Sequence, residues 1–324
     1  MDTLDQIKAP IKFHLKDFTK EFNHSMKSKV PLLNTITGYM VKRKGKQIRP
    51  IFVFLSAGIC GEISAKTSRA AALIELLHTA TLIHDDVVDE SYKRRGFFSL
   101  NALWGNKIAV LVGDFLLSRG LLLSVKNNDH DLLKIVSDAV QEMSEGELLQ
   151  IEKARKLDIE EDIYFEIIRK KTASLIASCC ATGVASVGAP ANQVEAFRKF
   201  GENVGIAFQI KDDIFDYQKS TNKEKPSGID IKEKKMTLPL IFLLQNSSYT
   251  QRQKIIYQVK NKSRDQKIVA EIIEKVMQSG GIEYATKHMN HYRNLALDFL
   301  KQYPESEFKA SLQTLVEYTT SRSK

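Results

Sequence analysis

Two short acidic segments with the same spacing are the parts of this sequence best suited to chemistry. Each reads Asp-Asp-x-x-Asp, the first from Asp85 to Asp89 and the second from Asp212 to Asp216. Residues four apart on a helix share a face, so the outer carboxylates of each segment repel each other unless a cation compensates them. An all-oxygen donor set favours Mg²⁺, which binds through one or two carboxylates and bridges to substrate phosphates. The candidate metal residues are Asp85, Asp86, Asp89, Asp212, Asp213 and Asp216.

A polar line leads into each acidic segment and favours a binding site over a solvated acidic face. Before Asp85 the line holds Thr81 and His78, at steps of four and three residues. Before Asp212 it holds Gln209. A polar line on an otherwise apolar helix is typical of a pocket wall. For His78 alone, a hydrogen-bonded core histidine remains an open alternative to a ligand role.

Basic residues form a third group, in separate parts of the chain. Arginine offers paired donors to phosphate, and an adjacent glycine lets the backbone approach closely. Anion sites beside acidic metal sites indicate a diphosphate substrate. Nucleic acid is the alternative partner, but the sequence has no aromatic-interleaved basic patch, helix-turn-helix or zinc finger. The basic segments are Lys42 to Pro50, Arg94 to Gly96, Lys170 to Thr172, and the single residues Lys225 and Lys235.

Helical periodicity dominates the chain, and alternating strand patterns are scarce. The most polar interruption, Gln218 to Lys235, contains Pro226 and Gly228 and is expected to be a mobile loop. We therefore expect an all-α fold with a single domain over residues 1–324. The expected helices are Ser68 to Asp89, Ile108 to Val125, Leu132 to Ile151, Tyr164 to Ala181, Val194 to Tyr217, Leu238 to Leu244, Gln251 to Val259, Lys267 to Ser279 and Ile282 to Gln302.

The composition excludes several classes of protein. With 43% hydrophobic and 27% charged residues, the 324-residue chain is neither disordered nor collagen-like. Its net charge of +9 suits an anionic partner without identifying it. The N-terminus does not resemble a signal peptide, the apolar run Ile51 to Cys60 is too short to span a bilayer, and the stretch 172–194 contains many small polar residues. Three cysteines without a CxxC pattern indicate neither disulfides nor zinc, so we expect a soluble, cytoplasmic protein.

These segments together make the chain resemble the trans-type polyprenyl diphosphate synthases, which extend isoprenoid diphosphates. The resemblance implies many antiparallel helices around a central cavity, and a homodimer. The matching segments, in the family's order, are Gly45 to Pro50, Glu75 to His78, Leu82 to Asp89, Arg94 to Gly96, Gly113 to Leu116, Gly146-Glu147, Lys171 to Ala173, Phe208-Gln209, Asp212 to Asp216, Lys225-Pro226, Gly228 to Asp230 and Lys235 to Pro239.

The resemblance also implies a role for each matching side chain. Asp85, Asp89 and Asp212 would bind the Mg²⁺ ions that hold an allylic diphosphate, with Asp86, Asp213 and Asp216 in support. The basic residues divide between two substrates, and three further residues flank the reacting carbons. Arg94, Lys171, Lys225 and Lys235 would neutralise the allylic diphosphate, Lys46, Arg49, His78 and Arg95 would grip isopentenyl diphosphate, and Thr172, Phe208 and Gln209 would flank the carbons.

The implied reaction needs no side-chain nucleophile. Cations stabilise the leaving diphosphate while the allylic C–O bond ionises, and the double bond of isopentenyl diphosphate then attacks the carbocation. Water must be excluded because it would capture the cation, so the loop from Gln218 to Lys235 is expected to act as a lid. Farnesyl diphosphate is the expected allylic partner, and a peripheral membrane contact would serve product release.

Three positions depart from the family pattern. Phe98 replaces a common proline after the Arg-Arg-Gly segment, and Glu224 and Lys234 replace the glycines that usually precede the two late lysines. Both lysines are retained, so we expect altered loop geometry and not lost activity.

Product length is predicted from the helix before the first acidic segment. In the resembled family the growing chain runs along this helix, and short-chain members place Tyr or Phe four or five residues before the motif. Here these positions hold Thr81 and Ala80, followed by Leu77 one turn further back. Each turn adds about 5.4 Å, close to one isoprene unit. We therefore expect a long product, heptaprenyl or octaprenyl diphosphate, unless Ala80 and Thr81 merely pack against another helix.

Three alternatives to a long-chain synthase remain. The first is a short-chain farnesyl or geranylgeranyl diphosphate synthase. A terpene cyclase would share the helical fold, but such cyclases usually lack a second full Asp-Asp-x-x-Asp segment and the isopentenyl-binding residues Lys46, Arg49 and Arg95. A non-catalytic subunit of a heteromeric synthase would typically have lost the aspartate segments, whereas this chain keeps both.

Overall fold

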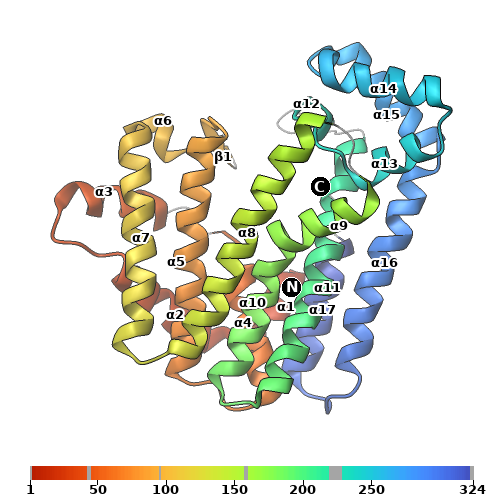
Figure 1. Ribbon diagram of the computed structural model, residues 1–324. Helices are drawn as coiled ribbons and strands as arrows, with labels where there is room; N and C mark the ends of the chain where they lie inside the picture. Colours follow the sequence, from red (N-terminus) through yellow and green to blue (C-terminus); the bar gives the residue numbers. More distant parts are fainter. Residues whose placement is uncertain (1, 42–44, 95, 157–159, 219–227, 322–324) are drawn as a thin grey trace. The chain divides into compact units, whose positions relative to one another are not determined.

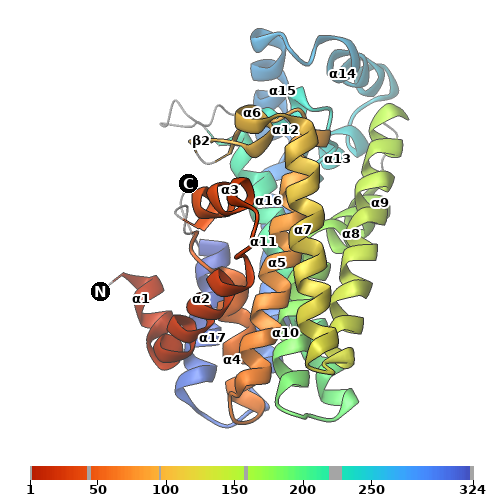
Figure 2. The same ribbon diagram turned by 90° about the vertical axis from the view of Figure 1, so that its left-hand side faces the viewer.

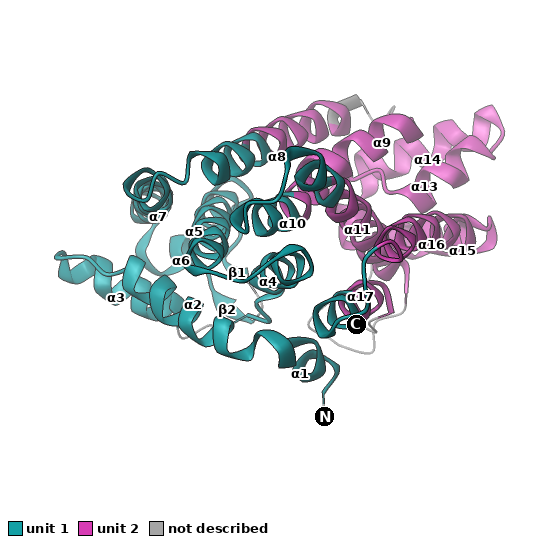
Figure 3. Ribbon diagram, turned by 90° about the horizontal axis from the view of Figure 1, so that it is seen from below, with its two compact units in different colours: residues 1–140, 178–198, 303–312 teal, residues 141–177, 199–302, 313–324 magenta. Residues whose placement is uncertain are grey.

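The computed structural model describes residues 2–41, 45–94, 96–156, 160–218 and 228–321, without the side chains of residues 94, 155 and 156. The chain divides into two compact units, coloured separately in Figure 3. Unit 1 contains residues 1–140, 178–198 and 303–312, and unit 2 contains residues 141–177, 199–302 and 313–324. Because each unit combines several stretches of sequence, the units are not consecutive domains. The single domain over residues 1–324 stays a prediction.

Helices form nearly all of the described secondary structure (Figure 1), which confirms the predicted all-α fold. The only strands in the described part of the chain are two residues long each. The elements are α1 (Thr3–Lys8), the 3₁₀-helix η1 (Ala9–Ile11), α2 (Lys12–Ser25), α3 (Pro31–Val41), α4 (Ile48–Cys60), α5 (Ala65–Val88), β1 (Lys93–Arg94), β2 (Phe97–Phe98), α6 (Leu100–Trp104), α7 (Asn106–Lys126), α8 (His130–Lys156), α9 (Glu161–Ile168), the π-helix η2 (Arg169–Ala173), α10 (Ser174–Ser186), α11 (Ala191–Tyr217), α12 (Ile229–Lys232), α13 (Leu238–Gln245), α14 (Tyr249–Lys262), α15 (Gln266–Gln278), α16 (Gly281–Leu300) and α17 (Glu307–Ser321).

In unit 1, α5 and α7 lie side by side along most of their length (Figures 1 and 2). Helix α5 begins after Ser64, whose backbone N–H donates to the Thr67 hydroxyl, a contact typical of a capping box. Leu73 and Leu77 of α5 pack against Gly120 of α7, where a Cβ would meet their side chains at 3.3 and 3.4 Å. The absence of a side chain at Gly120 therefore lets the two helices approach closely.

In unit 2, the apolar helix α13 is the centre of the core. Pro239 occupies its first turn, where the missing N–H costs no hydrogen bond. Helices α14, α15 and α16 pack around it. A Cβ at Gly281 would lie 2.6 Å from the Pro239 carbonyl oxygen, so only glycine allows α16 to begin against α13. This core includes Ile210 and Ile214, and thereby holds the C-terminal part of α11 that carries the second acidic segment.

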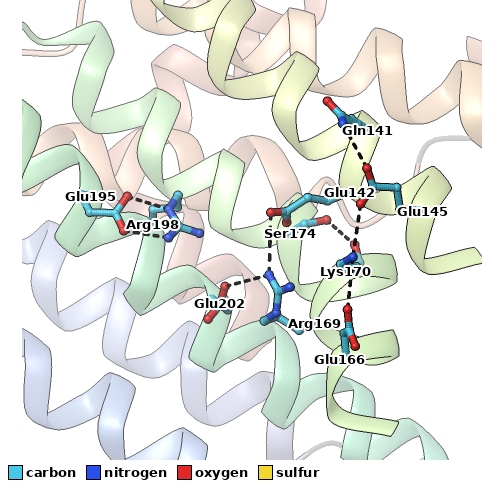
Figure 4. A network of polar contacts seen from close by, with 10 residues as sticks. All are labelled: Gln141, Glu142, Glu145, Glu166, Arg169, Lys170, Ser174, Glu195, Arg198 and Glu202. Carbon is cyan, nitrogen blue, oxygen red and sulfur yellow. Dashed lines mark hydrogen bonds and ion pairs between the residues drawn. The ribbon is translucent and has the colours of Figure 1, made fainter. Parts of the chain in front are cut away.

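A π-helical turn, η2, separates α9 from α10, so the prediction of one continuous α-helix from Tyr164 to Ala181 is wrong in this detail. Single π-turns within helices occur frequently at functional sites. Ion pairs fix the outer side of this turn (Figure 4). Lys170 contacts Glu145 and Glu166, both at 3.2 Å, and Arg169 contacts Glu142 at 3.7 Å. Lys171 and Thr172 lie in the same turn, directly after these two residues.

The other predicted helices agree with observed ones to within a few residues at most ends. The sequence interpretation predicted none of the helices before α5, and it also missed the short helices α6 and α12 and the C-terminal α17. It also overlooked α7 as a membrane candidate. Among the described helices, α7 is long and apolar enough to cross a membrane by length and composition alone, with 33% of that stretch buried.

Candidate active site

The first acidic segment lies at the C-terminal end of α5 in unit 1. Asp85 and Asp89 are exposed one turn apart, as the spacing predicts. Asp86 points into the protein and is 7% exposed. The Asp86 carbonyl accepts hydrogen bonds from the Asn101 amide at 3.0 Å and from the Ser91 N–H at 2.9 Å. These two bonds end the helix and fix the direction in which the exposed pair leaves it.

His84, directly before the first segment, packs on α7. Its ring occupies the space that a Cβ at Gly113 would fill. The ring nitrogen Nε2 lies 3.2 Å from the Val110 carbonyl oxygen and 3.5 Å from the Asp114 carboxylate. Gly113 and Asp114 belong to the matching segments of the sequence, and their position explains why a glycine is required there.

A β-hairpin follows the first segment and carries the predicted Arg94-Arg95-Gly96 anion site. Arg94 pairs with Phe97 across the two strands, and Gly96 makes the turn with a φ of 78°. Phe98, which departs from the family's proline, is exposed and has the Lys93 ammonium 5.4 Å from its ring centroid. Arg95 lies outside the described residues, as does the side chain of Arg94.

The predicted isopentenyl-binding residues lie at the start of α4 and in the middle of α5. Lys46 is exposed just before α4, and Gln47 takes a left-handed φ of 57°. Arg49 is 3.6 Å from Glu75, both being largely buried. His78 is half-buried one turn after Glu75. Within unit 1 the fold therefore brings Arg49 to Glu75, a neighbour that sequence reasoning gave no role.

The predicted chain-length residues lie further back along α5. Ala80 is 2% exposed and belongs to a cluster with Ala109 and Val112 of α7. Thr81 is half-buried and donates to the His78 carbonyl at 2.9 Å. Leu77 is 3% exposed, against α7. Ala80 therefore lies where α5 contacts α7, and its role in product length stays a prediction.

The second acidic segment ends α11 in unit 2 and is more buried than the first. Asp212 is half-buried, while Asp213 and Asp216 are 5% and 7% exposed. Asp216 caps α12, since its carboxylate accepts from the Ile229 N–H at 2.9 Å and from the Asp230 N–H at 3.0 Å. This cap holds the described end of the predicted loop, which contains a short helix instead of coil.

Asp213 takes part in a chain of hydrogen bonds between three elements. Its carboxylate accepts from the Tyr164 hydroxyl of α9 at 2.7 Å and from the Gln209 amide at 2.8 Å. The Gln209 carbonyl in turn accepts from the Thr172 hydroxyl at 3.0 Å. Burial, and then the charge of Asp230, raise the pKa of Asp213 to about 8 although both hydrogen bonds favour the ionised form. The fold thus joins the predicted residues Thr172 and Gln209 directly.

Asp230 is an acidic residue that sequence reasoning quoted within a matching segment but gave no role. Burial and the neighbouring Asp216 raise its pKa to about 6. Lys235 lies 3.7 Å from Asp230 and 2.5 Å from Glu233. Burial alone would lower the pKa of Lys235, but these carboxylates raise it overall. Lys234 takes a left-handed φ of 60° where the family usually has glycine, so this departure imposes a strained backbone.

The second predicted lysine of unit 2, Lys171, leaves the π-turn toward α8. Its ammonium forms an ion pair with Glu147 and donates to the Gln150 amide oxygen at 3.4 Å. A Cβ at Gly146 would lie 2.7 Å from the Lys171 backbone nitrogen, so glycine allows α8 to approach the turn. Phe208 is half-buried on α11, and Lys225 and Glu224 lie outside the described residues.

The donor chemistry fits a hard divalent cation. Asp85, Asp89 and Asp212 are solvent-accessible carboxylates. The buried Asp213 and Asp230 have raised pKa values, which a bound cation would lower because it favours the ionised form. Within the described ranges no three His, Cys, Asp or Glu side chains form a ready metal cage. Mg²⁺ does not require one, because it typically keeps waters and substrate phosphates as ligands.

Comparisons with known proteins match the chain to one family. The sequence profile of the polyprenyl synthetase family matches residues 30–276. The chain is 38% identical to the all-trans-nonaprenyl-diphosphate synthase (geranyl-diphosphate specific) of Rhodobacter capsulatus, over 99% of both chains. It is 34% identical to a short chain isoprenyl diphosphate synthase of Methanothermobacter thermautotrophicus, over 88% of both chains.

A solved structure shows the same fold. The polyprenyl synthase of Caulobacter crescentus, determined in complex with calcium and isoprenyl diphosphate, superposes with a TM-score of 0.90 at 30% sequence identity. The match covers 98% of both chains.

Proposed function

Since this chain belongs to the polyprenyl synthetase family, we propose that it extends an allylic diphosphate with isopentenyl diphosphate, giving a linear all-trans polyprenyl diphosphate. It is a transferase of the chain-elongating prenyltransferase type. The observation that carries the proposal is that two long helices, α5 and α11, each end in an Asp-Asp-x-x-Asp segment with cationic side chains in the same unit. Arg49 accompanies the first segment, and Lys171 and Lys235 accompany the second.

In the proposed reaction the protein binds the two substrates, orients them and shields the carbocation from water. Lys171 and Lys235 neutralise the diphosphate that leaves when the allylic C–O bond breaks. Arg49 and Lys46 hold isopentenyl diphosphate so that its double bond forms the new C–C bond, and the released diphosphate takes the proton lost in that step. Thr172, Gln209 and Phe208 flank the reacting carbons, and a dry site protects the carbocation.

We propose Mg²⁺ as the metal, with Asp85 and Asp89 at the end of α5 as its ligands in unit 1, and Asp212 at the end of α11 as its ligand in unit 2. When bound it would supply positive charge to the leaving diphosphate. The support is the all-oxygen donor set and the accessibility of these three carboxylates.

We propose a long-chain product, of heptaprenyl or octaprenyl length. The nonaprenyl-forming relative and the short-chain relative span both product classes by name, so the family alone leaves the length open. Small side chains at Ala80 and Thr81 support the longer class. Ala109 of α7, which belongs to the same cluster as Ala80, is small as well.

We further propose a homodimer formed through α7. Its outer face carries a row of exposed apolar residues that a monomer would leave in water. The row consists of Val110, Leu111, Leu121, Leu122 and Val125, which are 39–53% exposed. Asp114, which lies on α7 and contacts His84 of α5, favours a second copy over a bilayer as the cover, because a charged side chain in lipid is costly.

Sedimentation of the purified protein tests the dimer. Leu111→Asp with Leu122→Asp is expected to give a monomer. Phe13→Asp, at an apolar residue of α2 that is 82% exposed, is the control and should leave the mass unchanged. A monomeric wild-type protein would contradict the proposal.

We propose that the protein is cytoplasmic. We also propose that it contacts the membrane surface through α14 when it releases its product. One face of α14 is buried through Ile255 and Val259, while Tyr249 and Tyr257 are 78% and 57% exposed. Tyrosines and basic side chains suit an anionic lipid surface. From Tyr249 to Arg264 the chain has no acidic residue, and its basic residues are Arg252, Lys254, Lys260, Lys262 and Arg264.

Co-sedimentation with lipid vesicles tests this contact. Phosphatidylglycerol vesicles should bind the protein at low salt and phosphatidylcholine vesicles should not. Lys254→Glu with Lys260→Glu should abolish binding, while Lys12→Glu with Lys16→Glu on α2 makes the same charge change as a control. The contact would be contradicted if both pairs of substitutions reduced vesicle binding equally, or if the protein bound RNA but not the vesicles.

Incubation with Mg²⁺, farnesyl diphosphate and labelled isopentenyl diphosphate tests the main proposal. Linear elongated products are expected. Cyclic hydrocarbons would indicate a cyclase instead, and no turnover would indicate a non-catalytic subunit. Omission of the metal should abolish incorporation, and fractionation of cells checks the cytoplasmic location.

A further inference from the structure

Tyr164 of α9 reaches the second acidic segment from another element, and nothing in the proposed chemistry assigns it a role. Its hydroxyl donates to one carboxylate oxygen of Asp213 at 2.7 Å, while the Gln209 amide donates to the other at 2.8 Å. We propose that Tyr164 is a positioning residue for the prenyl transfer: it fixes Asp213, and through Asp213 the orientation of Gln209 beside the reacting carbons. This inference rests on the proposed function.

The pair of Tyr164 and Asp213 is expensive to bury, which argues against a purely structural role. Both side chains are 3–5% exposed, and Ile167, Ile168 and Ile214 belong to the same apolar cluster. A carboxylate in such surroundings costs free energy even when hydrogen-bonded, and an apolar pair of similar volume often stabilises a core better. Hydrogen-bonded networks of this kind are retained where they specify one geometry.

The direction of each hydrogen bond shows what the network specifies. Gln209 accepts from Thr172 with its carbonyl and donates to Asp213 with its amide. A rotation of the Gln209 amide by half a turn would break both bonds. The amide has this orientation because Asp213 offers it a carboxylate oxygen, and Tyr164 occupies the other oxygen of that carboxylate. Without Tyr164, Asp213 could turn away and release Gln209.

Asp212 directly precedes Asp213 on α11. The hydrogen bond from Tyr164 to Asp213 therefore also restricts the movement of a predicted metal residue. The three bonds connect α9, the π-turn and α11 within unit 2. They therefore couple the position of Thr172 to the helix end that carries Asp212.

Helix α9 supplies a matched control at Glu161, one turn before Tyr164. Tyr284 of α16 donates to both carboxylate oxygens of Glu161, each at 2.9 Å. Tyr284→Phe therefore removes a tyrosine–carboxylate contact that anchors the same helix but leaves Asp213 untouched. If Tyr164 only anchored α9, the two tyrosine variants should behave alike.

The first experiment compares Tyr164→Phe with Tyr284→Phe in the full-length protein. Tyr164→Phe should lower kcat at least tenfold and raise the Mg²⁺ concentration for half-maximal rate, with the melting temperature close to wild type. Tyr284→Phe should leave kcat within twofold. Wild-type kcat and Mg²⁺ requirement in Tyr164→Phe, or equal losses in both variants, would overturn the inference.

A double-variant cycle tests whether Tyr164 acts through Asp213. Adding Tyr164→Phe to Asp213→Asn should have no further effect on kcat. If the two residues acted independently, the fold losses in kcat would multiply. Should Asp213→Asn fail to fold, Gln209→Ala takes its place in the cycle. Multiplicative losses would overturn the inference.

Binding of inorganic diphosphate with Mg²⁺, followed by the rise in melting temperature, separates this inference from the proposed function. Tyr164→Phe should weaken the shift and Tyr284→Phe should not. This result can be obtained even if the wild-type protein shows no prenyl transfer, which would contradict the proposed function alone. An equal shift in both variants would count against the role of Tyr164.

Discussion

The His84 ring fills the space next to Gly113 that any larger residue would need, and this contact joins α5 to α7 immediately before the first acidic segment. We expect Gly113→Ala to push the ring away and to destabilise the protein by about 1–3 kcal/mol, the usual cost of overpacking. Turnover should fall as well, because Asp85 follows His84 directly.

Gly38 provides the control for this change. It lies within α3 with nothing near the position of a Cβ. Gly38→Ala should be neutral or stabilise the protein by up to about 1 kcal/mol, since alanine favours the helix more than glycine does. Thermal unfolding of both variants measures the difference, and equal effects would contradict the packing argument.

Removal of a metal-binding carboxylate should abolish turnover without unfolding the protein. Asp85→Ala removes an exposed side chain and Asp212→Ala a half-buried one, so neither leaves a large cavity. A loss of several kcal/mol in transition-state stabilisation lowers the rate by orders of magnitude, since about 1.4 kcal/mol is tenfold. Incorporation of labelled isopentenyl diphosphate measures the rate. More than about a tenth of wild-type activity at saturating Mg²⁺, a cost below that 1.4 kcal/mol, would refute the metal assignment.

The basic residues near α4 should act on one substrate only. Lys46→Ala is expected to raise the KM for isopentenyl diphosphate and to leave the KM for the allylic substrate nearly unchanged. Arg49→Ala should do the same, with some loss of stability because Glu75 loses its partner at 3.6 Å. Arg49→Lys keeps the charge and is the control for that stability loss. Equal rises in both KM values would contradict the division of the two sites.

A bulky residue on α5 should shorten the product. Ala80→Phe would fill the narrow contact between α5 and α7, where Ala109 and Val112 lie opposite. Products of farnesyl or geranylgeranyl length are expected, and Thr81→Phe should act in the same direction from the face that also carries Asp85. Chromatography of the dephosphorylated products measures the length. An unchanged distribution with activity retained would show that these residues only pack.

The thiols should be unreactive in the folded protein. Burial raises the pKa of Cys60 and of Cys180 to about 12, and that of Cys179 well above its ordinary value. At pH 8 a thiol with a pKa of 12 is thiolate in about one molecule in ten thousand. Titration with a disulfide reagent should therefore be slow in buffer and fast in guanidinium chloride. Rapid labelling of the native protein would contradict these pKa values.

The same pKa shifts predict how the stability of the protein depends on pH. The folded thiols have pKa values above those of the unfolded chain, so their contribution is complete below about pH 9 and is lost as the pH rises from there toward 12. Unfolding free energies measured across this range should fall with increasing pH.

The sequence by itself determined the fold class, the family and the pairs of carboxylates on one helix face. Those properties are local: Asp85 and Asp89 share a face because of helical periodicity, whatever surrounds them. The same holds for Asp212 and Asp216, although the pattern could not tell that Asp216 would cap α12.

Only the tertiary structure decided which side chains act on one another. The π-turn that contains Lys171 forms ion pairs with α8 and α9, and the close contact of α5 with α7 has His84 facing a glycine far along the chain. The contact of Tyr164 with Asp213 joins residues 49 positions apart. Such partners are set by how helices pack in three dimensions, and a one-dimensional pattern records the face of each helix but not what lies opposite it.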